Sequence, residues 1–260
     1  PTTGLTYGMR ALLPAALEYR DATNGAFDIT IAPIMDAWGF TGDQFRVPEQ
    51  SELNELLKHV NSDEIQVQEE PSYSVTLGEG QAIDLGGIAK GYTSDLVEQT
   101  FRANGIESGK ISLGGNVFVL GGKPDGSDWR VGIKDPRNES GLAAILSLRD
   151  AYAITSGGYE RYFTDDDGTI YWHIMDPSTG APAHSGLISV TIIGPCGLRC
   201  DGLSTALFVM GREKAAAHWA AHQDYEAVLV DESGTIWLTP GLKDRFIPVD
   251  QGETREIRIL

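Results

Sequence analysis

Apolar residues recur every three to four positions in five stretches of the chain, and this spacing predicts amphipathic helices. Asn24-Gly25, Asn61-Ser62-Asp63 and Asn104-Gly105 follow three of them as stop signals. Pro14 lies inside the first stretch and should kink that helix. The predicted helices cover residues 5–24, 48–60, 88–103, 201–210 and 213–222.

Short β-rich runs separated by turn residues predict strands, most of them antiparallel neighbours. Asp165-Asp166-Asp167-Gly168 reads as a hairpin tip, because Asp-Gly readily adopts the positive φ of tight turns. Gly114-Gly115 interrupts one run, so a ligand or another chain could approach the bare backbone there. The predicted strands are 65–69, 72–77, 81–85, 110–120, 129–134, 144–149, 152–155, 187–193, 225–230 and 234–238, with an aromatic strand before the tip and a return strand after it.

Residues 26–40 are dense in apolar and aromatic side chains without a clean period. The stretch predicts a short strand or turn, one helical turn and then an aromatic loop. Trp38 and Phe40 flank Gly39. They are either core residues, which is the usual fate of such side chains, or a wall for a flat ring.

Length and composition indicate a globular protein: 260 residues, 41% hydrophobic and 22% charged. We find no linker that would divide the chain, so we expect a single domain over residues 1–260. No apolar run approaches the ~18 residues of a membrane span. The chain opens at Pro1 with neither Met nor a signal segment, so we expect a trimmed form of a longer product.

The net charge of −17 excludes nucleic acid and anionic lipid as favoured partners, because no basic patch offsets it. An acidic protein that binds a pyrophosphate gains from a divalent cation. Cys196 and Cys200 do not suffice for a structural zinc site. A strained disulfide is one alternative, and two reduced, partly buried thiols are the expected state.

The stretch Asp84 to Tyr92 offers a place for an anion. Gly86 and Gly87 open the helix that follows, which leaves unpaired N–H groups and a positive dipole end exposed to a ligand. Lys90 lies close enough to reach the same anion. The alternative is an ordinary glycine-rich strand-to-helix turn with Asp84 as its cap.

Asp201 and Thr205 are four residues apart at a predicted helix start, so carboxylate and hydroxyl share one face. Mg²⁺ prefers such hard oxygen ligands and usually takes only one or two carboxylates. The alternative is that Asp201 caps the helix while Thr205 bonds back to it. The spacing alone leaves both interpretations open.

His173 lies three residues before Asp176-Pro177, where a strand end can face a cleft. Its pKa near neutrality makes it a candidate proton acceptor, with Asp176 beside it as a second catalytic candidate. A lone histidine is more often structural, and Asp176 can be a turn residue in a turn that Gly180 completes.

Taken together and in order, five motifs closely resemble the ApbE family of FAD:protein FMN transferases. The resemblance extends from about Leu5 to Leu242, and the aromatic stretch Phe27 to Phe40 fits the same family. The motifs are Asp84-Leu-Gly-Gly-Ile-Ala-Lys-Gly-Tyr92, Leu113-Gly-Gly, Thr155-Ser-Gly-Gly-Tyr-Glu-Arg-Tyr-Phe163, His173-Ile-Met-Asp-Pro-Ser-Thr-Gly180 and Asp201-Gly-Leu-Ser-Thr-Ala-Leu207.

The resemblance implies an α+β fold of mostly antiparallel sheets with packed helices. It also implies an enzyme that uses Mg²⁺ and FAD, transfers FMN to a threonine or serine of an acceptor protein and releases AMP. Asp201, Thr205 and the carbonyl of Gly87 would bind the metal, and His173 would be the base. The expected FAD contacts are Trp38, Gly39, Phe40, Asp84, Lys90 and Ile174.

Family members are often exported and tethered to the membrane through an N-terminal segment, so the resemblance implies an exported protein. The family's early strand and flavin-stacking aromatic residue have no counterpart before Leu5. Ser204 stands where some members carry a second aspartate, which would weaken the metal site.

Two other functions use the same residues: a magnesium-dependent FAD pyrophosphatase that gives FMN and AMP, and a carrier that binds FAD without turnover. A Rossmann dehydrogenase is rejected because Gly78-Glu-Gly80 precedes a strand instead of a helix. A serine hydrolase is rejected because Ser156 lacks the nucleophile-elbow motif.

Overall fold

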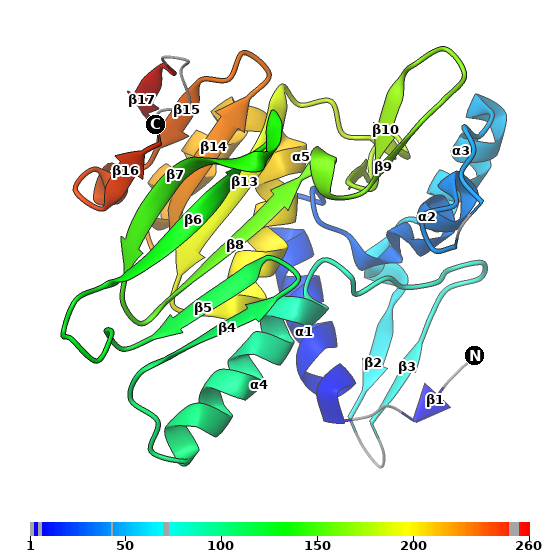
Figure 1. Ribbon diagram of the computed structural model, residues 1–260. Coiled ribbons are helices and arrows are strands. Elements are labelled where there is room, and N and C mark those ends of the chain that lie inside the picture. Colours follow the sequence, from blue (N-terminus) through cyan, green and yellow to red (C-terminus); the bar gives the residue numbers. More distant parts are fainter. Residues whose placement is uncertain (1–2, 5–6, 43, 70–72, 250–254) are drawn as a thin grey trace. The chain divides into compact units, whose positions relative to one another are not determined.

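The computed structural model describes residues 3–4, 7–42, 44–69, 73–249 and 255–260 (Figure 1). Residues 5, 6 and 72, at the ends of a predicted helix and a predicted strand, lie outside these ranges. The chain divides into two compact units. The first comprises Pro1–Gly87 and Arg161–Ala183, and the second comprises Ile88–Glu160 and His184–Leu260.

The first unit is built from helices and short strand pairs. Its helices are α1 (Tyr7–Ala22), α2 (Ala32–Trp38) and α3 (Gln50–Leu56), with 3-10 turns η1 (Ile29–Ile31), η2 (Leu57–His59) and η3 (Ser62–Glu64). Its strands are β1 (Thr3–Gly4), β2 (Gln66–Gln68) and β3 (Ser74–Thr76) in the order β1-β3-β2, the hairpin of β9 (Tyr162–Thr164) with β10 (Ile170–Trp172), and the pair β11 (Met175–Asp176) with β12 (Ala181–Pro182).

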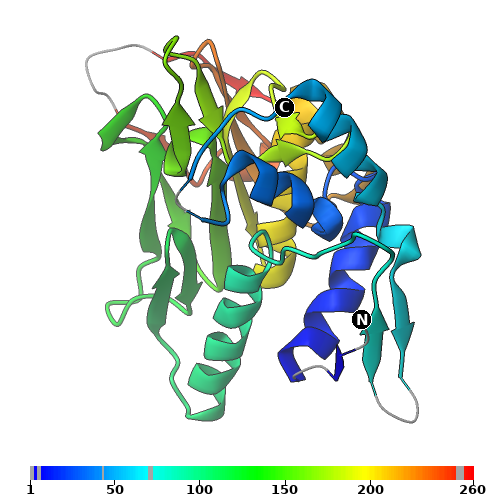
Figure 2. The ribbon, with the colours of Figure 1, turned by 90° about the vertical axis from the view of Figure 1, so that its right-hand side faces the viewer.

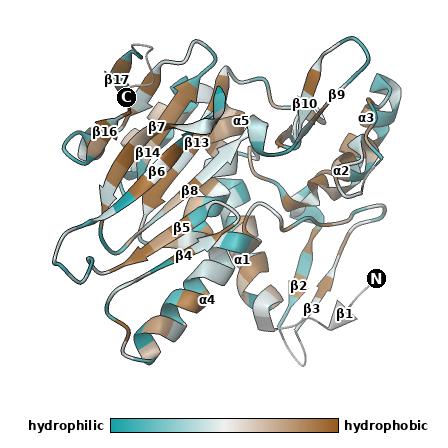
Figure 3. Cartoon of the chain, in the orientation of Figure 1, coloured by the Kyte–Doolittle hydropathy of each residue, from teal (hydrophilic) through white to brown (hydrophobic). Residues whose placement is uncertain are grey.

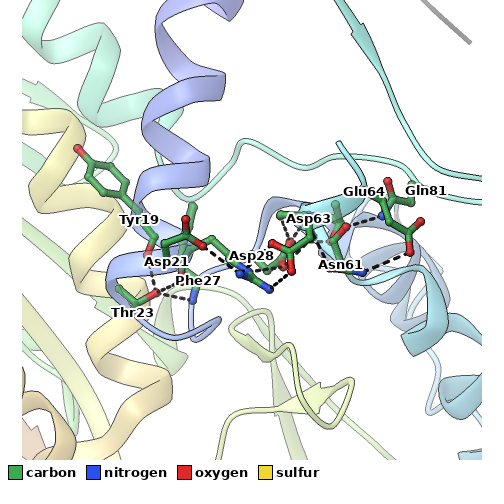
Figure 4. A network of polar contacts seen from close by, with 12 residues as sticks. Tyr19, Asp21, Thr23, Phe27, Asp28, Asn61, Asp63, Glu64 and Gln81 are labelled. Atoms are coloured by element: carbon green, nitrogen blue, oxygen red, sulfur yellow. Dashed lines mark hydrogen bonds and ion pairs between the residues drawn. The ribbon is translucent and has the colours of Figure 1, made fainter. Parts of the chain in front are cut away.

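A buried carboxylate links the 3-10 turn η1, which precedes α2, to the 3-10 turn η3. Asp28 Oδ1 accepts hydrogen bonds from the Thr30 amide at 2.8 Å and from the Ser62 hydroxyl at 2.5 Å. Figure 4 shows Asp28 within the wider polar network of this unit. Because Asp28 is buried, these bonds replace the water that its carboxylate loses on folding.

The second unit contains a seven-stranded sheet in the order β17-β15-β14-β13-β8-β5-β4, antiparallel except for β15 with β17. Its strands are β4 (Gly109–Leu113), β5 (Asn116–Leu120), β8 (Ala151–Gly157), β13 (Leu187–Gly194), β14 (Glu226–Asp231), β15 (Ile236–Leu238) and β17 (Ile257–Ile259). A three-stranded sheet pairs β6 (Trp129–Asp135), β7 (Asn138–Leu148) and β16 (Phe246–Pro248) in the order β16-β7-β6, with 3-10 turns η4 (Gly158–Glu160) and η5 (Pro240–Leu242) in the same unit.

Helices α4 (Ala89–Ala103) and α5 (Gly197–His222) contact each other, and α5 contacts β8 and β13 of the large sheet (Figure 2). The other face of that sheet forms one apolar cluster with the small sheet, including Val119, Leu146 and Val230. The central strands are therefore covered on both faces, and brown, hydrophobic colour gathers on β13 and β14 in Figure 3. This explains why β13 is an almost continuous apolar run.

The predicted α+β class is confirmed, and so are most predicted elements. Gly114 and Gly115 both have positive φ, at 55° and 94°, and they form the turn of the β4–β5 hairpin. Gly168 donates its amide to Asp165 O at 3.1 Å at the predicted hairpin tip. Both cysteines carry free thiols, as expected.

Three predicted elements were wrong. Residues 81–85 are not a strand. The aromatic stretch contains the seven-residue helix α2, which ends at Gly39 with φ of 82°. The helix expected to start at Asp201 begins at Gly197, whereas the break expected between residues 210 and 213 is matched by a kink at the non-helical Gly211 of α5.

The single domain over residues 1–260 stays a prediction.

No helix within the described ranges combines the length and the apolar content that a membrane crossing requires.

Candidate functional site

Asp201 lies in the second turn of α5 and is 4% exposed. Its Oδ2 accepts a hydrogen bond from the Gly91 amide of α4 at 2.7 Å. Burial raises the pKa of Asp201 to about 6, although the Gly91 hydrogen bond and the positive charge of Lys90 oppose this shift. A cation bound beside this carboxylate would stabilise its charged form, which burial disfavours.

Three hydroxyl groups gather on the same turn of α5 and the adjacent strand β8. The Ser204 hydroxyl donates to the Asp201 carbonyl at 2.8 Å, and its oxygen lies 2.7 Å from Ser156 Oγ. Ser156 Oγ also lies 3.3 Å from Thr205 Oγ1. Hence Ser204, and not Thr205, makes the back-bond to Asp201. The N-cap of α5 is Cys196, so the capping role considered for Asp201 is wrong.

Asn116 is a neighbour of this carboxylate that the sequence did not single out. Its side chain is buried at the start of β5, where it favours the charged form of Asp201. Within the described part of the chain, Nδ2 of Asn116 makes no hydrogen bond of ordinary length, so it acts on Asp201 from a longer distance. The only local signal was its place directly after Leu113-Gly114-Gly115.

Lys90 is the second residue of α4, and its side chain is exposed. A Cβ built on Gly114 would lie 3.8 Å from Lys90 Cδ, so the lysine stem extends toward the β4–β5 turn. The helix begins at Ala89, so the expectation that Gly86 and Gly87 open it was two residues early.

Asp84 and Gly87 belong to the first unit. Asp84 Oδ1 accepts from the Gly86 amide at 2.6 Å, and the Asp84 amide donates to Ile29 O at 2.7 Å. These bonds fix the turn in which Gly86 and Gly87 lie. The contacts of Asp84 with FAD and of Gly87 with a metal stay predictions.

Trp38 and Phe40 are core residues of the first unit, with exposures of 3% and 1%. The ring centroids of Trp38 and Tyr171 lie 5.2 Å apart, and those of Phe40 and Phe163 lie 5.8 Å apart. Gly39 must lack a side chain, because a Cβ there would overlap the carbonyl group of Gln44. The predicted contacts of these three residues with FAD stay predictions.

His173 follows β10 directly, and its Nδ1 lies 3.0 Å from the carbonyl oxygen of Arg161. A carbonyl oxygen can only accept, so we assign the Nδ1 proton to this hydrogen bond. In the neutral ring the lone pair is then on Nε2, which is the nitrogen able to accept a proton. The ring centroid of His173 lies 6.4 Å from that of Phe40.

Asp176 and Ile174 have structural partners. Asp176 Oδ1 accepts from the Ser178 amide at 2.8 Å and from the Ser178 hydroxyl at 2.6 Å. Its carbonyl accepts from Gly180 N at 2.8 Å, which closes the predicted turn. Ile174 is buried, and its carbonyl accepts from Ala183 N at 2.9 Å. The geometry therefore agrees with the turn interpretation of Asp176.

The donor set around Asp201 fits magnesium better than a softer metal. The described residues contain no group of three or more His, Cys, Asp or Glu side chains able to hold a metal. One carboxylate with hydroxyl oxygens in the next turn of the same helix is compatible with Mg²⁺, since it usually takes only one or two carboxylates and fills its remaining positions with carbonyls, waters and phosphates. Zinc usually requires more nitrogen or sulfur ligands.

Comparison with known proteins agrees with the motifs. A model of the ApbE family matches residues 5–229. The FAD:protein FMN transferase of Treponema pallidum is 34% identical, with 92% of this chain and 70% of that protein aligned. The enzyme of the same name from Klebsiella pneumoniae is 36% identical, with 92% and 72% aligned. The crystal structure of the ApbE protein from Thermotoga maritima has a TM-score of 0.88 at 35% identity, covering 94% of this chain and 80% of that one.

The fold and these relatives define an α+β protein of the transferase class. The chain belongs to the ApbE family.

Proposed function

We propose that the protein is a magnesium-dependent FAD:protein FMN transferase, which attaches FMN through a phosphoester to a threonine or serine of an acceptor protein and releases AMP. The relatives named above support the reaction class. The observation that carries the proposal is the buried Asp201 carboxylate, whose helix also carries the Ser204 and Thr205 hydroxyls in its next turn, with the Ser156 hydroxyl in contact with both of them.

Asp201 and Thr205 would hold the cation, together with the carbonyl of Gly87. All three supply oxygen, and the single carboxylate matches the preference of magnesium. The cation would neutralise part of the pyrophosphate charge, which a protein of net charge −17 otherwise repels. Within the chain itself, the Gly91 amide restricts the orientation of the Asp201 carboxylate by its hydrogen bond to Oδ2.

His173 would act as the base through Nε2. The Arg161 carbonyl accepts the Nδ1 proton, so the basic lone pair of the neutral ring is on Nε2. Nε2 would take the proton of the acceptor hydroxyl as that oxygen bonds to the phosphorus on the FMN side of FAD. The bond from this phosphorus to the bridging oxygen breaks, and AMP departs with that oxygen.

Lys90, Asp84 and the stretch Trp38 to Phe40 would bind FAD with Ile174. Lys90 suits the anionic part of the substrate, because its ammonium is exposed at the first turn of α4, where the helix dipole is also positive. Asp176 would act indirectly, by holding the turn that follows His173.

The proposal is tested by incubating the protein with FAD, Mg²⁺ and a threonine-bearing acceptor domain. We expect flavin fluorescence on the acceptor band after denaturing electrophoresis, with one AMP released for each flavin attached. The Asp201→Ala variant serves as the control and should give neither product. AMP with equal free FMN and an unlabelled acceptor would identify a pyrophosphatase, and unaltered FAD would identify a carrier.

A further inference from the structure

Helices α4 and α5 exchange two hydrogen bonds between glycine amides and carboxylates. The Gly91 amide of α4 donates to Asp201 Oδ2 at 2.7 Å, and the Gly197 amide of α5 donates to Asp95 Oδ1 at 2.6 Å. On each helix the glycine and the aspartate are four residues apart, so both lie on the face that meets the other helix. Each helix thereby supplies the acceptor for the first turn of its neighbour.

The two glycines allow the helix backbones to touch. A Cβ on Gly91 would overlap the carbonyl oxygen of Gly197, and a Cβ on Gly197 would lie 2.6 Å from the carbonyl oxygen of Gly91. Real Cβ atoms do not approach backbone atoms this closely. The exchange therefore depends on glycine at both positions, and a small relative shift of the helices would break both bonds.

Asp95 is the main cap of α5. Its Oδ2 accepts a second hydrogen bond from the Leu198 amide at 2.8 Å, and Cys196 Sγ lies 3.7 Å from the same oxygen. The N-cap residue Cys196 provides no side-chain cap within the described residues. The first amides of a helix carry a partial positive charge and need acceptors, so a carboxylate there is stabilising.

We propose that Asp95 is a positioning residue for the metal site. It holds the first turn of α5 against α4, so the Gly91 amide stays on Asp201 Oδ2 and the carboxylate keeps one orientation toward the cation. This inference rests on the proposed function, which assigns Asp201 to the metal. Groups that orient a metal ligand without touching the metal commonly affect metal affinity in this indirect way.

The experiment uses Mn²⁺ as the probe, followed by the electron paramagnetic resonance signal of the free ion. Asp95→Ala removes both hydrogen bonds and the charge, whereas Asp95→Asn keeps a carbonyl oxygen that can accept one amide. We expect the Mn²⁺ dissociation constant to rise about tenfold in Asp95→Ala and by a smaller factor in Asp95→Asn.

Glu98→Gln is the matched control, because it removes one negative charge from the same helix. Glu98 accepts from the Tyr152 hydroxyl at 2.7 Å and from Arg102, and it makes neither of the two glycine–carboxylate bonds between α4 and α5. We expect its Mn²⁺ affinity to equal that of the wild type. Equal losses in Asp95→Ala, Asp95→Asn and Glu98→Gln would indicate a charge effect and overturn the proposal.

A second measurement needs no metal. Amide exchange of the metal-free protein, resolved by NMR, should be faster at Gly91 by ~5-fold or more in Asp95→Ala, because the helix cap that holds its acceptor is lost. Unchanged exchange at Gly91 would overturn the proposal even if Gly197 and Leu198 exchange faster. If the wild type and Asp201→Ala bind Mn²⁺ equally, the metal assignment of the proposed function fails, and exchange at Gly91 still decides the role of Asp95.

Discussion

The indole N–H of Trp38 donates a hydrogen bond of 2.8 Å to the carbonyl oxygen of Gly180, a residue 142 positions further along the chain. Both residues are buried in the first unit. The bond joins the aromatic stretch to the last residue of the His173–Gly180 motif. Two segments that the sequence associated only by family resemblance are thus linked by a direct contact.

Trp38→Phe should lower the free energy of unfolding by about 1–3 kcal/mol, because it leaves the buried Gly180 carbonyl without this donor. Chemical denaturation measures the change. Tyr171→Phe is the matched control in the same aromatic cluster, since its hydroxyl donates a longer hydrogen bond, 3.2 Å, to Asp165. A loss in Trp38→Phe no larger than that of the control would show that the bond contributes little.

His173→Ala should slow transfer by a factor on the order of 10²–10⁴, the usual contribution of a general base. The dissociation constant for FAD should stay close to that of the wild type, because the predicted FAD contacts are elsewhere. Flavin fluorescence titration gives the binding constant, and AMP release gives the rate. If FAD binding falls as much as the rate does, His173 is a substrate contact.

Asp201→Asn should stabilise the metal-free protein at neutral pH. Burial raises the pKa of Asp201 to about 6, above its ordinary value of 3.8, so the folded state holds a proton that the unfolded state releases between these pH values. The stability of the wild type therefore falls as pH rises from about 4 to 6. Asparagine does not titrate, so the variant lacks this dependence on pH. Its free energy of unfolding should exceed that of the wild type by on the order of 3 kcal/mol at pH 7.5 and by nothing below about pH 4.

Denaturation in EDTA across this pH range measures the difference between the two proteins. Stability curves that run parallel would contradict the raised pKa of Asp201. Adding Mg²⁺ should raise the melting temperature of the wild type and leave that of Asp201→Asn unchanged, because ligand binding to the folded state stabilises it. An equal rise in both proteins would place the cation elsewhere.

Gly91→Ala should destabilise the protein by about 1–3 kcal/mol, because the new Cβ overlaps the backbone of Gly197 and forces the helices apart. The variant should also slow transfer, since Asp201 loses its amide partner. Gly42→Ala is the control: its Cβ would meet no described atom within 4 Å. Equal stability of the two variants would show that the helix contact adapts without cost.

The spacing of apolar and polar residues predicted most helices and strands, because it reflects which face of each element is buried. It failed at the start of α5, where the cap is Asp95, 102 residues before Gly197, and no residue nearby signals it. By contrast, the break predicted between residues 210 and 213 coincides with the kink at Gly211, whose φ of 77° is not helical. The false strand at 81–85 had strand-like residues without a partner strand among the described residues.

The same limit applies to the candidate site. Spacing and residue type made Asp201, Thr205 and His173 candidates, and only the family resemblance gave them their roles. Ser156 and Asn116 could not be chosen, because only the packing of β8 and β5 brings Ser156 to Ser204 and Asn116 near Asp201. The Arg161 carbonyl, which orients His173, is a backbone atom that sequence patterns do not distinguish.

The most direct test of the account is the intact mass of a threonine-bearing acceptor after incubation with the protein, FAD and Mg²⁺, with AMP measured in the same sample. FMN transfer predicts an acceptor heavier by one FMN phosphoryl group, one AMP for each modified acceptor, and no change when the acceptor threonine is replaced by valine. An acceptor of unchanged mass beside stoichiometric AMP and free FMN would contradict the account.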